Sequence, residues 1–261
     1  MRNLILAAAL VTAATAHGAT LTEAFDKTYD VRPGAEVSLN NINGGITIAV
    51  WDQPRVRIVA EKKVKGDKSE VQEAMKELRI EVTAAAGGLN IKTHYPNESD
   101  GGIAGLFDLL QGRDDVDAQV TYQLTVPRSM NLDISNTNGG ISVSDVSGRL
   151  ELDTTNGKIE TARCAGSLDA STTNGGISAE FTSVTRGADI SASTTNGRIT
   201  ISVPRNFAGE IDAGTTNGAI TTDLPVATRH VGDNRLRGTI NGGGTPMKLR
   251  TTNGAIQIKA L

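Results

Sequence analysis

The C-terminal half of the chain is dominated by a repeat of the form Thr-Asn-Gly-x-Ile. Apolar or small residues stand six and four positions before each asparagine, and an isoleucine follows three positions after it. A period of roughly 20 residues is typical of stacked architectures. The repeat asparagines are Asn138, Asn156, Asn174, Asn196, Asn217 and Asn253, and the isoleucines are Ile141, Ile159, Ile177, Ile199, Ile220 and Ile256.

Alternation within each unit predicts strands with one buried face. Apolar residues occupy even offsets before the Asn-Gly pair and odd offsets after it, which is the period of a β-strand. Each unit is long enough for two short strands and two turns, so it fits one coil of a β-solenoid. Asn-Gly between strands is also a hairpin signal, and an antiparallel meander is the alternative.

The solenoid makes specific predictions about packing. Equivalent isoleucines would stack into an apolar spine, and equivalent asparagines could hydrogen-bond as a ladder. Because Asn and Gly tolerate positive φ, the pair is interpreted as a sharp corner. Asn241-Gly242 is out of phase, yet the interval from Asn217 to Asn253 is twice the first interval. Residues 228–245 are therefore expected to form an excursion from the stack.

Residues 1–16 have the pattern of a secretory signal peptide. Arg2 gives a positive start, an apolar run follows, and Ala14-Thr15-Ala16 fits a small-x-small cleavage site. No later segment is long and apolar enough to span a bilayer, so we expect an exported chain without a transmembrane anchor. Cys164 is the only cysteine, which excludes an internal disulfide and fits a small residue in a turn between coils.

Residues 17–130 are interpreted as a β-rich region that precedes the repeat solenoid of residues 131–261. The repeat pattern occurs once in this region, around Asn43-Gly44. A helix is expected at 69–79, where an apolar stripe follows a capping sequence, and it should pack on the sheet or cover the first edge of the solenoid. Residues 80–94 are expected to form a strand.

Residues 96–119 are predicted to be an insertion. Within it, Ile103, Leu106, Phe107 and Leu110 have helical spacing, so a short amphipathic helix could dock on the body, or on a membrane or partner. The fold class expected for the whole chain is all-β. It is a β-solenoid, a single-stranded β-helix-like stack, with one short helix and a partly helical insertion.

Several of these segments together resemble the bacterial putative adhesin family of unknown function. The resemblance rests on Asn43-Gly-Gly-Ile-Thr-Ile48 with Trp51-Asp52, the helix near 70–79, the strand ending at Val126-Pro127, and the tandem Thr-Asn-Gly-x-Ile units. It covers nearly the whole mature chain. It implies an exported or envelope-associated β-solenoid with no established chemistry.

Titratable residues are not arranged as in known catalytic or metal sites. His94 and His230 lie outside the regular units and have no metal-ligand spacing. The acidic turn at 114–117 lacks the glycine and the distal glutamate of a calcium loop. No nucleophile elbow or phosphate loop occurs, and a net charge of −3 gives no case for nucleic acid. We therefore expect no catalytic residue, no metal and no cofactor.

The strongest enzymatic alternative is a carbohydrate-active enzyme, either a polysaccharide lyase or a glycosidase. Such enzymes need carboxylates that converge on one surface. Outward offsets before the turn would stack Asp133, Glu151 and Asp169, with Asp153 beside them. A solvated acidic column is the plainer interpretation.

A column of threonines is the weak candidate for ligand binding. Each threonine directly precedes a repeat asparagine and should face outward, where hydroxyls could meet a glycan, although side-chain stacking alone also explains the pattern. An adjacent Thr-Thr pair points to opposite faces, so only one outward column is expected, unlike an ice-binding solenoid. The candidates are Thr155, Thr173, Thr195, Thr216 and Thr252, preceded by Thr137.

The sequence therefore predicts an exported cell-envelope protein, periplasmic, cell-surface or secreted, that serves adhesion or scaffolding without catalysis. An envelope protein or a glycan surface is the expected partner. The C-terminal strand at 255–261 carries no proline-rich or strongly charged cap, so self-association through this strand is also expected.

Overall fold

The computed structural model describes residues 9–10, 19–85, 87–96, 116–184, 188–232 and 234–261. Most of the expected signal peptide and residues 97–115 of the expected insertion, with its helix and Asp114-Asp115, lie outside the described residues. In the part of the chain that is described, no helix has the length and hydropathy needed to cross a bilayer.

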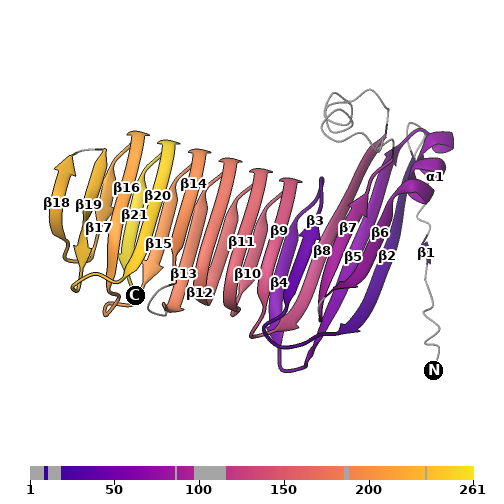
Figure 1. Ribbon diagram of the computed structural model, residues 1–261. Helices are drawn as coiled ribbons and strands as arrows, with labels where there is room; N and C mark the ends of the chain where they lie inside the picture. Colours follow the sequence, from indigo (N-terminus) through magenta and orange to yellow (C-terminus); the bar gives the residue numbers. More distant parts are fainter. Residues whose placement is uncertain (1–8, 11–18, 86, 97–115, 185–187, 233) are drawn as a thin grey trace.

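The repeat units form a β-solenoid, as the sequence predicts (Figure 1). A strand that ends at the repeat asparagine and a strand that begins three residues later make one coil, and successive coils pair in parallel. Parallel pairing rules out the antiparallel meander for these units. The strands are β9 (Asn131–Asn138), β10 (Ile141–Ser144), β11 (Ser147–Asn156), β12 (Ile159–Asn174), β13 (Ile177–Ser183), β14 (Ile190–Asn196), β15 (Ile199–Val203), β16 (Gly209–Asn217) and β17 (Ile220–Thr222).

The stack therefore has two long sheets, which we call the pre-turn sheet and the post-turn sheet. The pre-turn sheet holds the strands that end at the asparagines, and the post-turn sheet holds those that follow the glycines. β12 runs continuously from one sheet to the other, with a bulge between Thr161 and Cys164.

The core is a column of aliphatic side chains between these sheets. Ile141, Ile159, Ile177 and Ile199 stand in register and are at most 1% exposed. Burying each such side chain contributes about 1.5–3 kcal/mol, so the predicted isoleucine spine is a principal source of stability. Ile220 is partly exposed because its coil is the last of the post-turn sheet.

The order of coils departs from the order of the sequence. β20 (Thr245–Asn253) and β21 (Ile256–Ala260) are the last strands of the chain, but they insert between β14/β15 and β16/β17 (Figure 1). Asn253 thus pairs with both Asn196 and Asn217. The expected column of repeat asparagines is therefore continuous through this coil.

The expectation of a free strand edge for self-association at residues 255–261 is wrong over Ile256–Ile258. There β21 is hydrogen-bonded on both sides, to β15 and to β17, so this part offers no free edge to a second chain.

The excursion expected at 228–245 is an antiparallel hairpin that extends the pre-turn sheet. β18 (Ala227–Gly232) pairs with β19 (Arg235–Ile240), and β19 pairs with β16. Asn241 has a φ of 46° and its side-chain amide donates to the carbonyls of Arg205 and Phe207. This asparagine holds a turn and takes no part in the repeat column.

The stack begins well before residue 131, where the sequence placed its start. β3 (Glu36–Asn40) and β4 (Ile46–Trp51) form a coil that stacks directly on β9 and β10. β7 (Gly88–His94) and β8 (Asp117–Pro127) pair in parallel with β3 and β4 and add a further coil. The sequence that connects β7 to β8 contains no Asn-Gly pair.

Antiparallel strands and one helix cover the N-terminal end. β2 (Ala19–Asp30) pairs with β5 (Arg55–Gly66), and β5 pairs with β8. The two-residue β1 (Ala9–Leu10) lies along β2. α1 (Lys68–Glu77) buries Val71 and Met75 at this end of the stack (Figure 1). The strand expected at 80–94 is instead a hairpin of β6 (Arg79–Ala85) and β7.

Candidate functional site

A continuous ladder of asparagine side chains runs along one corner of the solenoid. Each side-chain amide nitrogen donates to the side-chain oxygen of the asparagine in the preceding coil, at 2.7–2.9 Å. A neutral hydrogen bond of this kind contributes about 0.5–1.5 kcal/mol. In spatial order, the ladder consists of Asn43, Asn138, Asn156, Asn174, Asn196, Asn253 and Asn217.

The reason given for the Asn-Gly pair from the sequence is only partly right. Among described residues other than glycine, positive φ occurs at Asp145, Arg163 and Asn241, and at none of the ladder asparagines. The asparagines are required for their amides. The glycines are required mainly because the coils approach closely: a Cβ on Gly157 would lie 2.0 Å from the carbonyl oxygen of Gly139.

The two threonines before each asparagine have different roles. The first is buried, and its hydroxyl donates to a glycine carbonyl of the neighbouring coil, as Thr172 does to Gly157 at 3.0 Å. The second is exposed on the pre-turn sheet beside the ladder. These exposed residues form the threonine column, which comprises Thr155, Thr173, Thr195, Thr252 and Thr216, while Thr137 is half-buried.

A buried polar cluster closes the N-terminal end of the ladder. The Asn43 amide donates to the carbonyl of Ala118, and the Tyr95 hydroxyl bonds both the carbonyl of Asn43 and the side-chain oxygen of Asn41. Thr93 bridges Asn41 and Tyr122. Burial raises the pKa of Tyr122 to about 12, so its hydroxyl stays protonated and these groups act as a structural cap.

Acidic side chains gather at one end of the exposed face of the pre-turn sheet. Asp133, Glu151 and Asp169 are adjacent across β9, β11 and β12, and Asp153 stands beside Glu151. Arg149 pairs with Glu151 at 2.5 Å. Partial burial raises the pKa of Asp153, and the neighbouring Asp169 and Glu151 add to the effect. We call this region the acidic zone.

Replacing Asp153 by asparagine is expected to stabilise the fold at neutral pH. Because the folded-state pKa of Asp153 is raised, its charge costs stability once the pH exceeds that pKa, and costs nothing below the usual aspartate value of 3.8. The melting temperature of Asp153→Asn should therefore exceed that of the wild type at pH 7 and converge with it below pH 3.8. Asp30→Asn, in β2, is the matched control. An equal gain at both pH values would contradict this account.

Basic side chains gather at the opposite end of the same face. Asp212 accepts from Arg237 at 3.0 Å and pairs with Arg250 at 2.8 Å, while Arg235 is 3.9 Å away. The bond from Arg237, reinforced by Arg250, holds the pKa of Asp212 below its usual value. Lys248 is exposed next to Asp212. We call Arg235, Arg237, Lys248 and Arg250 the basic zone.

Two shallow hollows border the basic zone. One, of about 340 Å³, is lined by Asp212, Arg237 and Lys248, and the other, of about 300 Å³, by Thr216, Arg235 and Arg250. The sequence analysis missed this zone because its members come from β16, β19 and β20. The sequence signal that could have indicated this zone is the spacing of Arg235 and Arg237, which places both on the same face of one strand.

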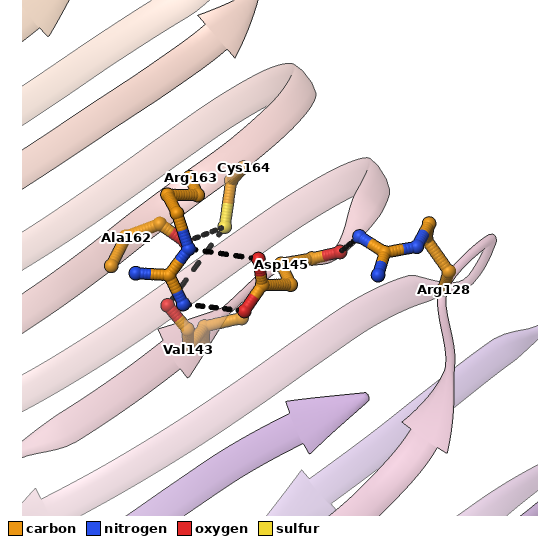
Figure 2. A network of polar contacts seen from close by, with 6 residues as sticks. All are labelled: Arg128, Val143, Asp145, Ala162, Arg163 and Cys164. Carbon is orange, nitrogen blue, oxygen red and sulfur yellow. Dashed lines mark hydrogen bonds and ion pairs between the residues drawn. The ribbon is translucent and has the colours of Figure 1, made fainter. Parts of the chain in front are cut away.

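The second corner of the coils contains a polar network around Cys164 (Figure 2). The Arg163 guanidinium donates two hydrogen bonds to the Asp145 carboxylate, at 2.9 and 2.6 Å, and Arg128 donates to the Asp145 carbonyl. Asp145 and Arg163 both have positive φ, which costs about 1–3 kcal/mol each. Cys164 is fully buried within the bulge of β12, so it packs in the core at this corner.

The Cys164 thiol is expected to be inert in the folded protein. It is inaccessible, and burial raises its pKa above the usual thiol value, which lowers the thiolate fraction. Reaction with a chromogenic disulfide reagent should be slow in buffer and fast in denaturant, with one thiol released per chain. An exposed Ser183→Cys variant provides the control. Rapid labelling of native wild type would show that the corner opens.

Metal ligation has no support among the described residues, where no group of three or more His, Cys, Asp or Glu side chains could hold an ion. His94 contacts the Glu81 carboxylate at 2.9 Å. The features that this geometry offers to a partner are therefore the threonine column and the two charged zones.

A protein-family model, Toastrack DUF4097, matches residues 35–259. The chain belongs to the Toastrack DUF4097 family. This agrees with the resemblance to bacterial adhesin-like repeat proteins drawn from the sequence. No protein of curated function matches the chain.

Solved structures similar to this Toastrack chain have low sequence identity. A putative cell adhesion protein from Clostridium sporogenes is 13% identical, covers 91% of this chain and 100% of its own, and superposes with a TM-score of 0.50. A putative adhesin from Bacteroides fragilis is 9% identical, with 91% and 97% coverage and a TM-score of 0.27. The first similarity supports the fold.

Proposed function

We propose that this Toastrack protein is an exported cell-envelope protein that acts as an adhesin or scaffold through the long faces of its solenoid, without catalysis. The observation that carries the proposal is the exposed threonine column beside the exposed asparagine ladder. Hydroxyl and amide groups recur there at the strand spacing of about 4.8 Å. The name of the similar Clostridium structure, a putative cell adhesion protein, and the signal-like pattern of residues 1–16 support the same function.

A glycan is the partner that this surface fits best. Glycan hydroxyls both donate and accept hydrogen bonds, as do threonine hydroxyls and asparagine amides. A repeated row of such groups could bind a polymer through many weak contacts. The affinity would then come from multivalent binding. The column runs over Thr155, Thr173 and Thr195 without interruption.

Cell fractionation combined with envelope binding tests this proposal. The full chain, expressed in a bacterium, should be recovered from the envelope or medium. Purified protein should co-sediment with isolated envelopes. A triple variant, Thr155→Ala, Thr173→Ala and Thr195→Ala, should bind about tenfold more weakly, or roughly 1.4 kcal/mol.

The matched control is a triple variant of Ser142→Ala, Ser178→Ala and Ser202→Ala, which alters half-buried hydroxyls of the post-turn sheet. It should bind envelopes as the wild type does. Cytoplasmic retention, or equal binding by both triple variants, would refute the proposed role of the column.

The competing proposal is a carbohydrate-active enzyme, for which the raised pKa of Asp153 beside Glu151 is the motivating observation. A carboxyl group with a raised pKa beside a second carboxylate is one feature of an acid–base pair. Release of sugar from a cell-wall or plant polysaccharide, abolished by Glu151→Ala, would establish it. No release from such substrates would leave binding as the function of this face.

A further inference from the structure

The exposed face of the pre-turn sheet is divided by charge. Two of its outward columns stand five and three positions before each asparagine. On β9, β11 and β12, every charged residue in these columns is an acid. On β14, both positions are serine, Ser191 and Ser193. On β20 they are Lys248 and Arg250. The outward residues of β19 are Arg237 and Arg235.

Asp212 does not remove the positive character of the basic zone. It pairs with Arg237 and Arg250 at 3.0 and 2.8 Å, so one acid is shared by several cations. The chain as a whole has a net charge of only −3. The separation on this face is therefore a matter of placement. On one side of the serine strand β14 every charged residue of the two columns is an acid, and on the other side Arg235, Arg237, Lys248 and Arg250 outnumber Asp212 and its neighbour Glu210.

We propose that this face binds a second copy of the same chain, with the two solenoids antiparallel. A two-fold axis lying along β14 would place the acidic zone of each copy on the basic zone of the other. Asp169 would face Lys248 and Asp133 would face Arg237. Glu151 would face Asp212, whose charge is offset by Arg237 and Arg250. A two-fold axis along the solenoid would instead oppose acids with acids, so the charges select the antiparallel arrangement.

The dimensions of the face fit a weak but specific dimer. From β9 to β19 the sheet is about 30 Å wide at the usual strand spacing, and six residues of strand span roughly 20 Å. The contact is then on the order of 600 Å² per copy, at the lower end for specific interfaces. Its polar character makes the association depend on ionic strength, since exposed charges are screened within about 10 Å at 0.1 M salt and about 3 Å at 1 M.

The charges allow a test by mutual rescue. Variant one carries Asp169→Lys, which places a cation opposite Lys248 of the other copy. Variant two carries Lys248→Glu, which places an acid opposite Asp169 of the other copy and leaves Arg237 and Arg250 on Asp212. Analytical ultracentrifugation should find a wild-type dimer in low salt that dissociates in about 1 M salt. Each variant alone should be monomeric, and an equimolar mixture should dimerise.

The control carries Ser178→Lys and Thr200→Lys on the post-turn sheet and should dimerise like the wild type. Circular dichroism and thermal melting establish that each variant is folded, as expected for outward side chains. A wild type that is monomeric in low salt, variants that dimerise alone, or a mixture that stays monomeric would each overturn the proposal. Loss of dimer in the control would also overturn it, because association would then use the other sheet.

Discussion

Replacing Gly157 by alanine is expected to destabilise the solenoid by about 3 kcal/mol. The added Cβ would lie 2.0 Å from the carbonyl oxygen of Gly139 and 2.5 Å from its carbon. Both are backbone atoms of the neighbouring coil, so no side chain can move aside. The coils would have to separate at this corner, which stretches the ladder bond from Asn156 to Asn138 and the bond from Thr154 to Gly139.

Thermal denaturation measures this effect, and a loss of about 3 kcal/mol corresponds to a fall of roughly 10 °C in a chain of this size. Gly45→Ala is the matched control because its Cβ would be 3.9 Å from the nearest atom, the Gly140 carbonyl oxygen. The equivalent position of another coil already holds Lys158. Equal melting temperatures for the two variants would show that close approach of coils is not what demands glycine.

Deleting residues 255–261 is expected to unfold the C-terminal third of the stack. Backbone hydrogen bonds hold this segment on both sides: the Ile199 N–H donates to the Ala255 carbonyl, and the Ile256 N–H donates to the Ala219 carbonyl. Ile256 and Ile258 are fully buried, and removing two such side chains costs on the order of 5 kcal/mol. β15 and β17 would lose their shared neighbour.

Limited proteolysis of the truncated chain measures the outcome. Cleavage should appear within residues 190–254, while the coils from β3 to β13 remain protected. Removing Leu261 alone is the control, since its side chain is half exposed and only one backbone bond, to Val203, is lost. A truncated chain with unchanged protease resistance and melting temperature would contradict the observed coil order.

The fold class followed from the sequence because the alternation and the asparagine column are strictly local signals. Outward and inward positions were predictable for Ile159, Thr155 and Asp169 from the period of two alone. Stacking of equivalent residues then required only that strands run parallel.

The order of the last coils was not predictable in the same way. The units around Asn217 and Asn253 have the same pattern, so either could stack on Asn196. The chain that connects the two units decides which of them stacks on the Asn196 unit, and the periodicity of the sequence gives no information on this choice. The same limitation concealed the basic zone, whose arginines meet Asp212 only because β19 folds back on β16 and β20 lies on its other side.

The N-terminal coil was concealed for a different reason. The sequence between β7 and β8 has no Asn-Gly pair of the kind that identifies the other units. Leu89 and Ile91 are nevertheless in register with Val37 and Leu39. This coil therefore keeps the alternation of inward-facing apolar residues, although it lacks the Asn-Gly pair.

The intercalated C-terminal coil also constrains when the molecule can be completed. A chain that emerges from the ribosome, or from a translocation pore, presents β16 and β17 before β20 and β21 exist. The earlier pair must wait unstacked, or dock first on β14 and β15 and then be displaced. β16 and β17 therefore reach their final position only after β20 and β21 have been synthesised, because β20 and β21 join this end of the stack to the rest.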